Sequence, residues 1–185
     1  LIVGLDCAEP SLLLERWRDQ LPVLSGLRER GAHGRLTSVI PPITVPAWSC
    51  MMASRTPGDH GVYGFRNRAD HSYDNLFIAN STAIKEPRLW DLATRAGKPS
   101  IVLGVPGTYP PRPLNGVMVS CFLTPTTDSQ YTFPPMLKRE IEQTVGEYLL
   151  DVRDFRTDDK DYLLRQVYEM TDRRFALAEH LLDTR

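Results

Sequence analysis

The hydrophobic pattern alternates between short continuous apolar runs and segments with helical spacing. The run Leu1–Leu5 contains no polar position and ends at Asp6, which is typical of a buried strand in a parallel sheet. Ser100–Val105 has the same character and follows a helical segment. Strands that alternate with helices in this way predict an α/β fold with a mainly parallel central sheet flanked by helices.

The other elements are expected from the same patterns and from residues that end helices. Gly31 and Gly97 suit the ends of two helices, and Pro46 is tolerated in the first turn of another. We expect helices at Ser11–Arg18, Leu24–Arg30, Val45–Ser54, Arg88–Ala96 and Met136–Thr144, and a long one from Asp158. Further strands are expected at Gly34–Ile40, Leu76–Ala79 and Gly116–Phe122, with a structured loop at Thr56–Asn67 and an irregular connection at Pro106–Pro113.

Two helices have apolar faces that predict where they pack. In the first helix, Leu12, Leu13 and Trp17 are expected to face the sheet. In the last helix the core stripe is expected to consist of Leu163, Val167, Met170, Leu177 and Leu181.

Composition narrows the function classes. The 185 residues are 42% apolar, enough for one substantial core, so we expect residues 1–185 to form a single domain. The net charge of −1 gives no electrostatic case for a nucleic-acid polymer or a membrane surface as partner. Cys7, Cys50 and Cys121 are odd in number and widely spaced, which argues against a disulfide framework and favours a reducing cytoplasm.

Both ends of the sequence lie inside expected elements. The chain begins within a strand and finishes at Leu181–Arg185, a helical pattern without a Gly or Pro to stop it. We therefore expect residues 1–185 to be the N-terminal part of a longer domain, truncated at both ends.

Asp6 and Thr44 are the candidate chemical groups. Asp6 falls at the carboxyl end of the first expected strand, where open α/β sheets carry functional residues. Thr44 precedes a helix, where backbone N–H groups and the helix dipole favour an anion. A metal-binding carboxylate and an activated hydroxyl are parts of a phosphoryl-transfer site. Taken singly, each residue also fits a plain capping or turn role.

Three motifs together resemble the alkaline phosphatase superfamily, and within it the type I phosphodiesterase/nucleotide pyrophosphatase branch. They are Gly4-Leu5-Asp6, Pro42-Ile43-Thr44-Val45-Pro46-Ala47-Trp48 and Thr56-Pro57-Gly58-Asp59-His60-Gly61. The resemblance implies an alkaline phosphatase-like fold, incomplete in this chain, and a site with two divalent metal ions, usually Zn²⁺. It implies that Asp6 is a metal ligand and that Thr44 is both nucleophile and ligand. Asn67 is the nearest candidate for the Asn that hydrogen-bonds a phosphoryl oxygen.

The function implied by this resemblance is metal-dependent hydrolysis of a small phosphate ester or nucleotide. Thr44 would attack phosphorus in line and form a phosphothreonine that water then hydrolyses. One Asp and one Thr cannot hold two zinc ions, which need three or more protein ligands each. The remaining ligands are therefore expected outside this chain, which alone is expected to be inactive.

Other interpretations stay open. A sulfatase would need a Cys/Ser-x-Pro-x-Arg motif, which Cys50–Ser54 does not provide, and a phosphoglycerate mutase-like enzyme normally uses Ser. From a different class, a degenerate, non-catalytic binding module would keep the fold without metals.

Several loop residues have both a structural and a functional interpretation. His60 could bind a metal, but its Gly-flanked position favours a structural role in holding backbone carbonyls. Arg55, Arg66 and Arg68 could approach a substrate phosphate or could be ordinary solvated side chains.

Overall fold

The computed structural model describes residues 1–185. They divide into two compact units, Leu1–Ser38 and Val39–Arg185, each of which is described by itself.

The first unit consists of helical turns and irregular segments. It contains the π-helical turn η1 (Leu12–Arg16), the 3₁₀ turn η2 (Arg18–Gln20) and α1 (Pro22–Arg30). The Arg28 guanidinium donates to the Leu14 carbonyl at 2.8 Å, which ties α1 to η1. The predicted helix at 24–30 is confirmed, and its C-cap is Gly31. Gly31 adopts extended backbone there rather than the left-handed conformation that glycine often supplies.

Two strands predicted for this part of the sequence are wrong. Residues 1–5 and 34–40 have no regular secondary structure, and neither sheet of the protein includes them. Leu1, Ile2, Val3 and Leu5 each keep more than half of their surface exposed. An apolar run forms a strand only where another strand completes its hydrogen-bond ladder, and no strand of the chain pairs with either segment.

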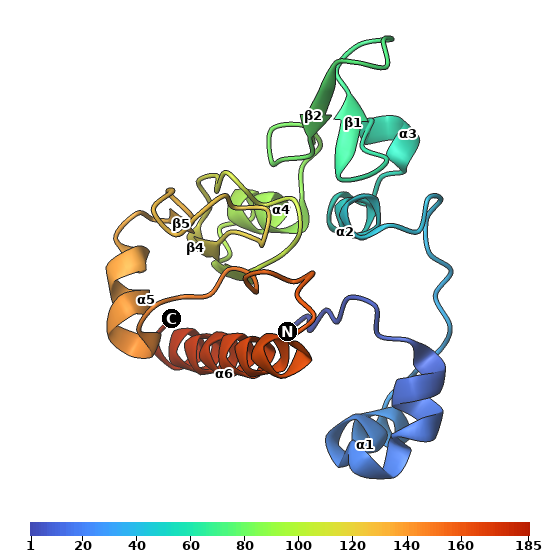
Figure 1. The fold of residues 1–185 in the computed structure, drawn as a ribbon, viewed down its shortest axis with the longest axis vertical. Coiled ribbons are helices and arrows are strands. Elements are labelled where there is room, and N and C mark those ends of the chain that lie inside the picture. Colours follow the sequence, from blue (N-terminus) through green and yellow to red (C-terminus); the bar gives the residue numbers. More distant parts are fainter. The chain divides into compact units, whose positions relative to one another are not determined.

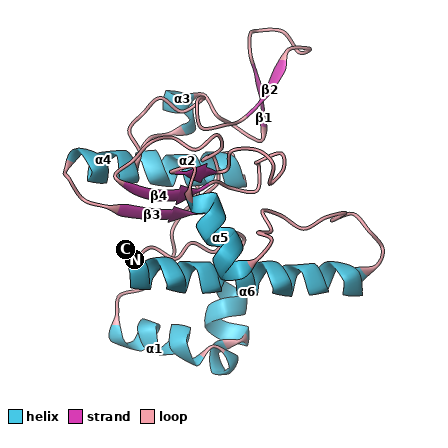
Figure 2. Ribbon diagram, turned by 90° about the vertical axis from the view of Figure 1, so that its left-hand side faces the viewer, coloured by secondary structure: helices cyan, strands magenta, loops and turns pink.

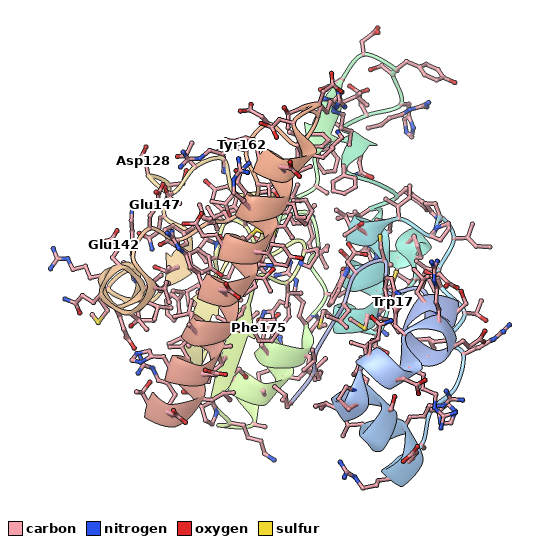
Figure 3. All side chains as sticks on the ribbon, turned by 60° about the horizontal axis from the view of Figure 1, so that its bottom comes forward. Trp17, Asp128, Glu142, Glu147, Tyr162 and Phe175 are labelled. Atoms are coloured by element: carbon pink, nitrogen blue, oxygen red, sulfur yellow. The ribbon has the colours of Figure 1, made fainter.

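The expected burial of the first helix is also wrong. Leu12 and Leu13 are only partly buried, and Trp17, labelled in Figure 3, is exposed. The helix is interrupted as well, because the π-helical turn passes into a 3₁₀ turn within residues 12–20. The apolar positions of this segment therefore do not form one continuous helical face.

The second unit is built on a small mixed sheet, which confirms the α/β fold class. Its strands are β3 (Ser100–Leu103), β4 (Gly116–Val119) and β5 (Thr132–Phe133), in the order β3-β4-β5. β3 and β4 are parallel, as the strand–helix–strand pattern predicts, whereas β5 adds an antiparallel edge.

Helices cover both faces of this sheet (Figure 2). Strand side chains alternate between the faces, because successive residues of a strand point to opposite sides. Val117 and Val119 pack with Leu177 and Leu181 of α6 (Lys160–Thr184) and with α5 (Leu137–Val145). On the other face, Val102 and Met118 pack with Met52 of α2 (Thr44–Ala53) and Trp90 of α4 (Leu89–Arg95).

The long helix α6 confirms most of its predicted stripe. Leu177 and Leu181 are fully buried, and Leu163 and Met170 are partly buried. Val167 is exposed, so its assignment to the core is wrong. Phe175, also exposed, is labelled on this helix in Figure 3.

A separate antiparallel hairpin, labelled β1 and β2 in Figure 1, follows the short helix α3 (Pro57–His60). Its strands are β1 (Arg66–Arg68) and β2 (Leu76–Ile78), which confirms the strand expected at 76–79. Residues 56–67, expected to be a structured loop, contain α3 and the beginning of β1. The helices expected at 45–54, 88–96 and 136–144 are confirmed to within one residue, and the irregular segment at 106–113 is confirmed.

Candidate functional site

Thr44 is the first residue of α2. The preceding residue, Ile43, is the N-cap with extended backbone, and no side chain caps the helix. Thr44 therefore does not use its hydroxyl as an N-cap, the commonest structural role of a Thr in this region. The side chain is partly buried and its oxygen has no hydrogen-bond partner within the chain.

The first turn of α2 leaves two backbone donors unused. Pro46 has no N–H, and the N–H of Ala47 donates to the Ile43 carbonyl at 3.0 Å. The N–H groups of Thr44 and Val45 remain without an acceptor, as expected for the first residues of a helix. With the positive end of the helix dipole, these donors favour an anion beside the Thr44 hydroxyl.

Asn67 is buried in β1 and its amide holds the preceding loop. Its Oδ1 accepts the N–H of Tyr63 at 2.7 Å, and its Nδ2 donates to the Gly64 carbonyl at 3.0 Å. A primary amide has two N–H bonds, so one of them remains for another acceptor.

A small apolar cluster connects the start of α2 with the loop that Asn67 holds. Val45, which follows Thr44, packs in one cluster with Val62 from that loop, Ala79 from the end of the hairpin and Ile84. Val45 and Val62 are almost completely buried. The elements that carry Thr44 and Asn67 therefore share a common core, although the sequence separates the two residues by a whole helix and a loop.

His60 and Cys50 form a buried pair that links α3 to α2. The Nδ1 atom of His60 accepts the N–H of Val62 at 3.1 Å, and its Nε2 lies 3.3 Å from the Cys50 sulfur. Because Nδ1 acts as an acceptor, the neutral ring carries its proton on Nε2 and donates it to sulfur. His60 thus has a structural role, as the sequence indicates, but it binds a backbone N–H instead of a carbonyl.

Burial keeps this pair neutral. It lowers the pKa of His60, an effect that the carboxylates of Glu86 and Asp59 partly oppose. It also raises the pKa of the Cys50 thiol, and Asp59 adds to that rise. Since both ring nitrogens are occupied, metal binding by His60 would require one of these hydrogen bonds to break.

Asp59 and Thr56 fix the start of α3 in an arrangement that our sequence analysis missed. The Asp59 carboxylate accepts both the N–H and the hydroxyl of Thr56, each at 2.8 Å. These hydrogen bonds lower the pKa of Asp59. The signal was present, because a Thr followed by an acidic residue three positions later is the pattern of a capping box.

Asp6 lies in a turn of the first unit. Its Oδ1 accepts the N–H of Cys7 at 3.0 Å, and the residue is exposed. Thr44 belongs to the second unit. The chain contains no group of three or more His, Cys, Asp or Glu residues that could hold a metal ion, whereas a zinc site generally needs three or more protein ligands. The donors of this chain therefore do not fit a complete metal site.

Comparison with known protein families gives a match over residues 1–181 to the type I phosphodiesterase / nucleotide pyrophosphatase family. The chain belongs to this family. No curated protein and no solved structure matches it. Family membership confirms the resemblance drawn from the three motifs and supports a hydrolase of the phosphodiesterase or pyrophosphatase type. The family is generally metal-dependent and acts on small phosphodiester or nucleotide substrates.

Two further observations concern the environment of this family member. None of its helices combines the length and the apolar character that crossing a bilayer requires. All three cysteines are free thiols, with Cys7 exposed and Cys50 and Cys121 buried.

Proposed function

We propose that this chain supplies the nucleophile of a metal-dependent phosphodiesterase or nucleotide pyrophosphatase, and that Thr44 is that nucleophile. The observation that carries the proposal is the start of α2. There a hydroxyl without an internal partner lies beside two backbone N–H groups that also have none. A nucleophile at the positive end of a helix can meet a phosphoryl group that the same helix end stabilises.

The chemistry takes place in two displacements at phosphorus. The Thr44 oxygen forms a bond to phosphorus while the bond to the leaving oxygen breaks, and the hydroxyl proton passes to solvent. Water then attacks the phosphothreonine, the bond between phosphorus and Thr44 breaks, and the hydroxyl is restored. The N–H groups of Thr44 and Val45 and the remaining N–H of Asn67 donate to the non-bridging phosphoryl oxygens, where negative charge is concentrated.

We also propose that two divalent metal ions, with Zn²⁺ as the first expectation, take part. Asp6 and Thr44 are the ligands that we assign to this chain. Because the chain's own donors do not complete a metal site, the other ligands are assigned to residues outside this sequence. Such ions would favour the ionised form of the Thr44 hydroxyl and balance charge on the leaving oxygen.

Hydrolysis of bis(4-nitrophenyl) phosphate in the presence of zinc tests the nucleophile. The assay uses the longest natural form of the protein and compares Thr44→Ala with the matched variant Thr44→Ser, which keeps a hydroxyl. We expect Thr44→Ala to lower kcat by at least about a thousand-fold, whereas Thr44→Ser retains measurable turnover. Mass spectrometry of the quenched reaction should find the phosphoryl group on Thr44.

Two results would contradict the proposal in different ways. Equal rates for Thr44→Ala and the unchanged protein would exclude Thr44 as the nucleophile. No turnover together with no bound zinc would favour the non-catalytic binding module over the enzyme.

A further inference from the structure

The long helix α6 has a second, mostly apolar stripe beside its buried face, and this stripe is exposed along most of its length. Its positions are separated alternately by four and three residues, which is the spacing of a helix–helix contact in a coiled coil. Its large apolar side chains are all exposed. The stripe consists of Leu164, Tyr168, Thr171, Phe175, Ala178 and Leu182.

The stripe is a continuous surface and not a scatter of single exposed residues. At a rise of about 1.5 Å per residue it extends over roughly 27 Å of the helix. Phe175, which Figure 3 labels on α6, lies near its middle. Scattered apolar residues are ordinary on a protein surface, whereas a contiguous apolar surface rimmed by polar residues marks a place of interaction.

The order of side-chain sizes along the stripe fits a second copy of the same helix that runs in the opposite direction. When two copies are centred midway between Thr171 and Phe175, each Phe175 lies opposite Thr171 of the second copy. Each Tyr168 likewise lies opposite Ala178, and the leucines at the two ends of the stripe lie opposite each other. Layers that place a large residue against a small one fill space evenly. A parallel pair would instead place every residue opposite itself, ring against ring.

The charges beside the stripe favour the same arrangement. Arg165 and Glu179 lie on its polar flank towards opposite ends, both are exposed, and neither forms an ion pair within the chain. In the antiparallel pair, Arg165 of each copy lies beside Glu179 of the other, and two-fold symmetry makes this contact twice. In a parallel pair the same two residues would be separated by roughly 21 Å along the helices.

Asp172 supplies the contact that opposes this arrangement. It lies on the same flank as Arg165 and Glu179, midway between them, and it is exposed. In the antiparallel pair it therefore lies next to the two-fold axis, where its carboxylate approaches the Asp172 carboxylate of the second copy. Like charges at this distance repel each other, so neutralising this residue should strengthen the pair.

We propose that α6 joins two copies of this chain in a symmetric, antiparallel dimer through this stripe. The second copy is the occupant because the stripe matches its own reverse both in side-chain size and in the charges of Arg165 and Glu179. The proposal is independent of the role of Thr44, since α2 and its first turn do not contribute to the stripe.

Sedimentation equilibrium of the longest natural form of the protein, from about 1 to 200 µM, measures the dissociation constant of the dimer. We expect Phe175→Asp to raise this constant at least about ten-fold, because symmetry brings two unpaired carboxylates into the apolar contact. The matched control is Phe155→Asp, which changes a phenylalanine of similar exposure, 61% against 58%, outside α6. It should leave the constant within about two-fold of that of the unchanged protein.

Exchanging the charges tests the direction of the helices. Glu179→Arg should weaken the dimer about three-fold or more, because it sets a second cation beside Arg165 of the other copy. The double variant Arg165→Glu/Glu179→Arg should restore the original constant to within about two-fold. The two residues are too far apart within one helix to interact, so restoration can arise only between copies. Asp172→Asn should tighten the dimer, a gain that a folding defect does not produce.

Three results would overturn the proposal. The first is a protein that remains monomeric over the whole concentration range, as expected if other residues of a longer natural form cover the stripe. The second is equal weakening by Phe155→Asp and Phe175→Asp. The third, a charge exchange that does not restore the dimer, would overturn the antiparallel arrangement.

Discussion

At the scale of single residues, His60 is the side chain whose contacts make the sharpest prediction. Replacing it with Ala leaves the Val62 N–H and the Cys50 sulfur without their partner and opens a void in a buried position. We expect His60→Ala to lower the free energy of unfolding by about 2–3 kcal/mol, as measured by urea denaturation. The exposed His71 is the matched control, and His71→Ala should change it by less than about 0.5 kcal/mol.

The same residue predicts how stability depends on pH. Burial lowers the pKa of His60 below its ordinary value of 6.5, so near and below that value the unfolded chain takes up the proton more readily. Stability should therefore be complete above about pH 7 and should decrease as the pH falls through 6.5. Carboxylates with lowered pKa, such as Asp59 and Glu140, affect stability only in a more acidic range.

Urea denaturation between about pH 7.5 and pH 5.5 measures this effect. The variant His60→Gln removes the titrating group and should flatten the pH dependence in that window. An equally steep decrease in His60→Gln would mean that another group is responsible.

The sequence indicates candidate residues for the site, but it does not indicate their contacts. A Thr at a helix start and an Asn after a His-Gly pair can be recognised from type and spacing. The two hydrogen bonds that Asn67 makes with the 63–64 backbone, or the choice of ring proton on His60, depend on atoms brought together by folding. The contact of Cys50 with His60 could not be predicted, because a sequence does not distinguish an isolated buried thiol from one that is paired with histidine.

At the scale of elements, the parallel pair β3–β4 depends on a glycine at its first position. Gly116 pairs with Ser100 and has a φ of +128°, and a Cβ atom there would clash with the Ser100 carbonyl oxygen and nitrogen. We expect Gly116→Ala to cost at least about 3 kcal/mol of stability, because backbone atoms of the ladder would have to move.

Gly97 provides the matched comparison for this prediction. It also has a positive φ, +70°, but no atom lies near the position of a Cβ. Gly97→Ala should lower the free energy of unfolding by only about 1 kcal/mol, because the left-handed backbone conformation alone is unfavourable for alanine. Thermal unfolding of both variants, followed by circular dichroism, compares them, and equal losses would show that the close approach in the β3–β4 ladder is unimportant.

Local signals account for the elements that the sequence predicted correctly. Helices α1, α2 and α4 begin or end at a Pro, at a Gly or at a residue with left-handed backbone. Such residues start or stop a helix through local conformation, so a short stretch of sequence is enough to predict these boundaries. The strands expected at 1–5 and 34–40 needed a partner strand, which no local pattern supplies. Residues 57–60 became a helix because the Thr56–Asp59 hydrogen bonds support a single turn that is too short for periodicity to reveal.

At the scale of the whole molecule, the buried core belongs to the second unit. Every residue of all three hydrophobic clusters lies within 39–185, and no residue of 1–38 is buried. The prediction of one domain over residues 1–185 and the pairing of Asp6 with Thr44 both require the two units to act together. Both stay predictions, because Asp6 and Thr44 belong to different units.

Removing residues 1–38 decides between these possibilities. Because burial of apolar surface is the dominant stabilising term, a fragment that keeps all three clusters should keep most of the stability. We expect residues 39–185 to unfold cooperatively in urea with a free energy within about 1 kcal/mol of that of the whole chain. A fragment that fails to fold would instead show that residues 1–38 are an essential part of one domain, in which Asp6 could then serve the same site as Thr44.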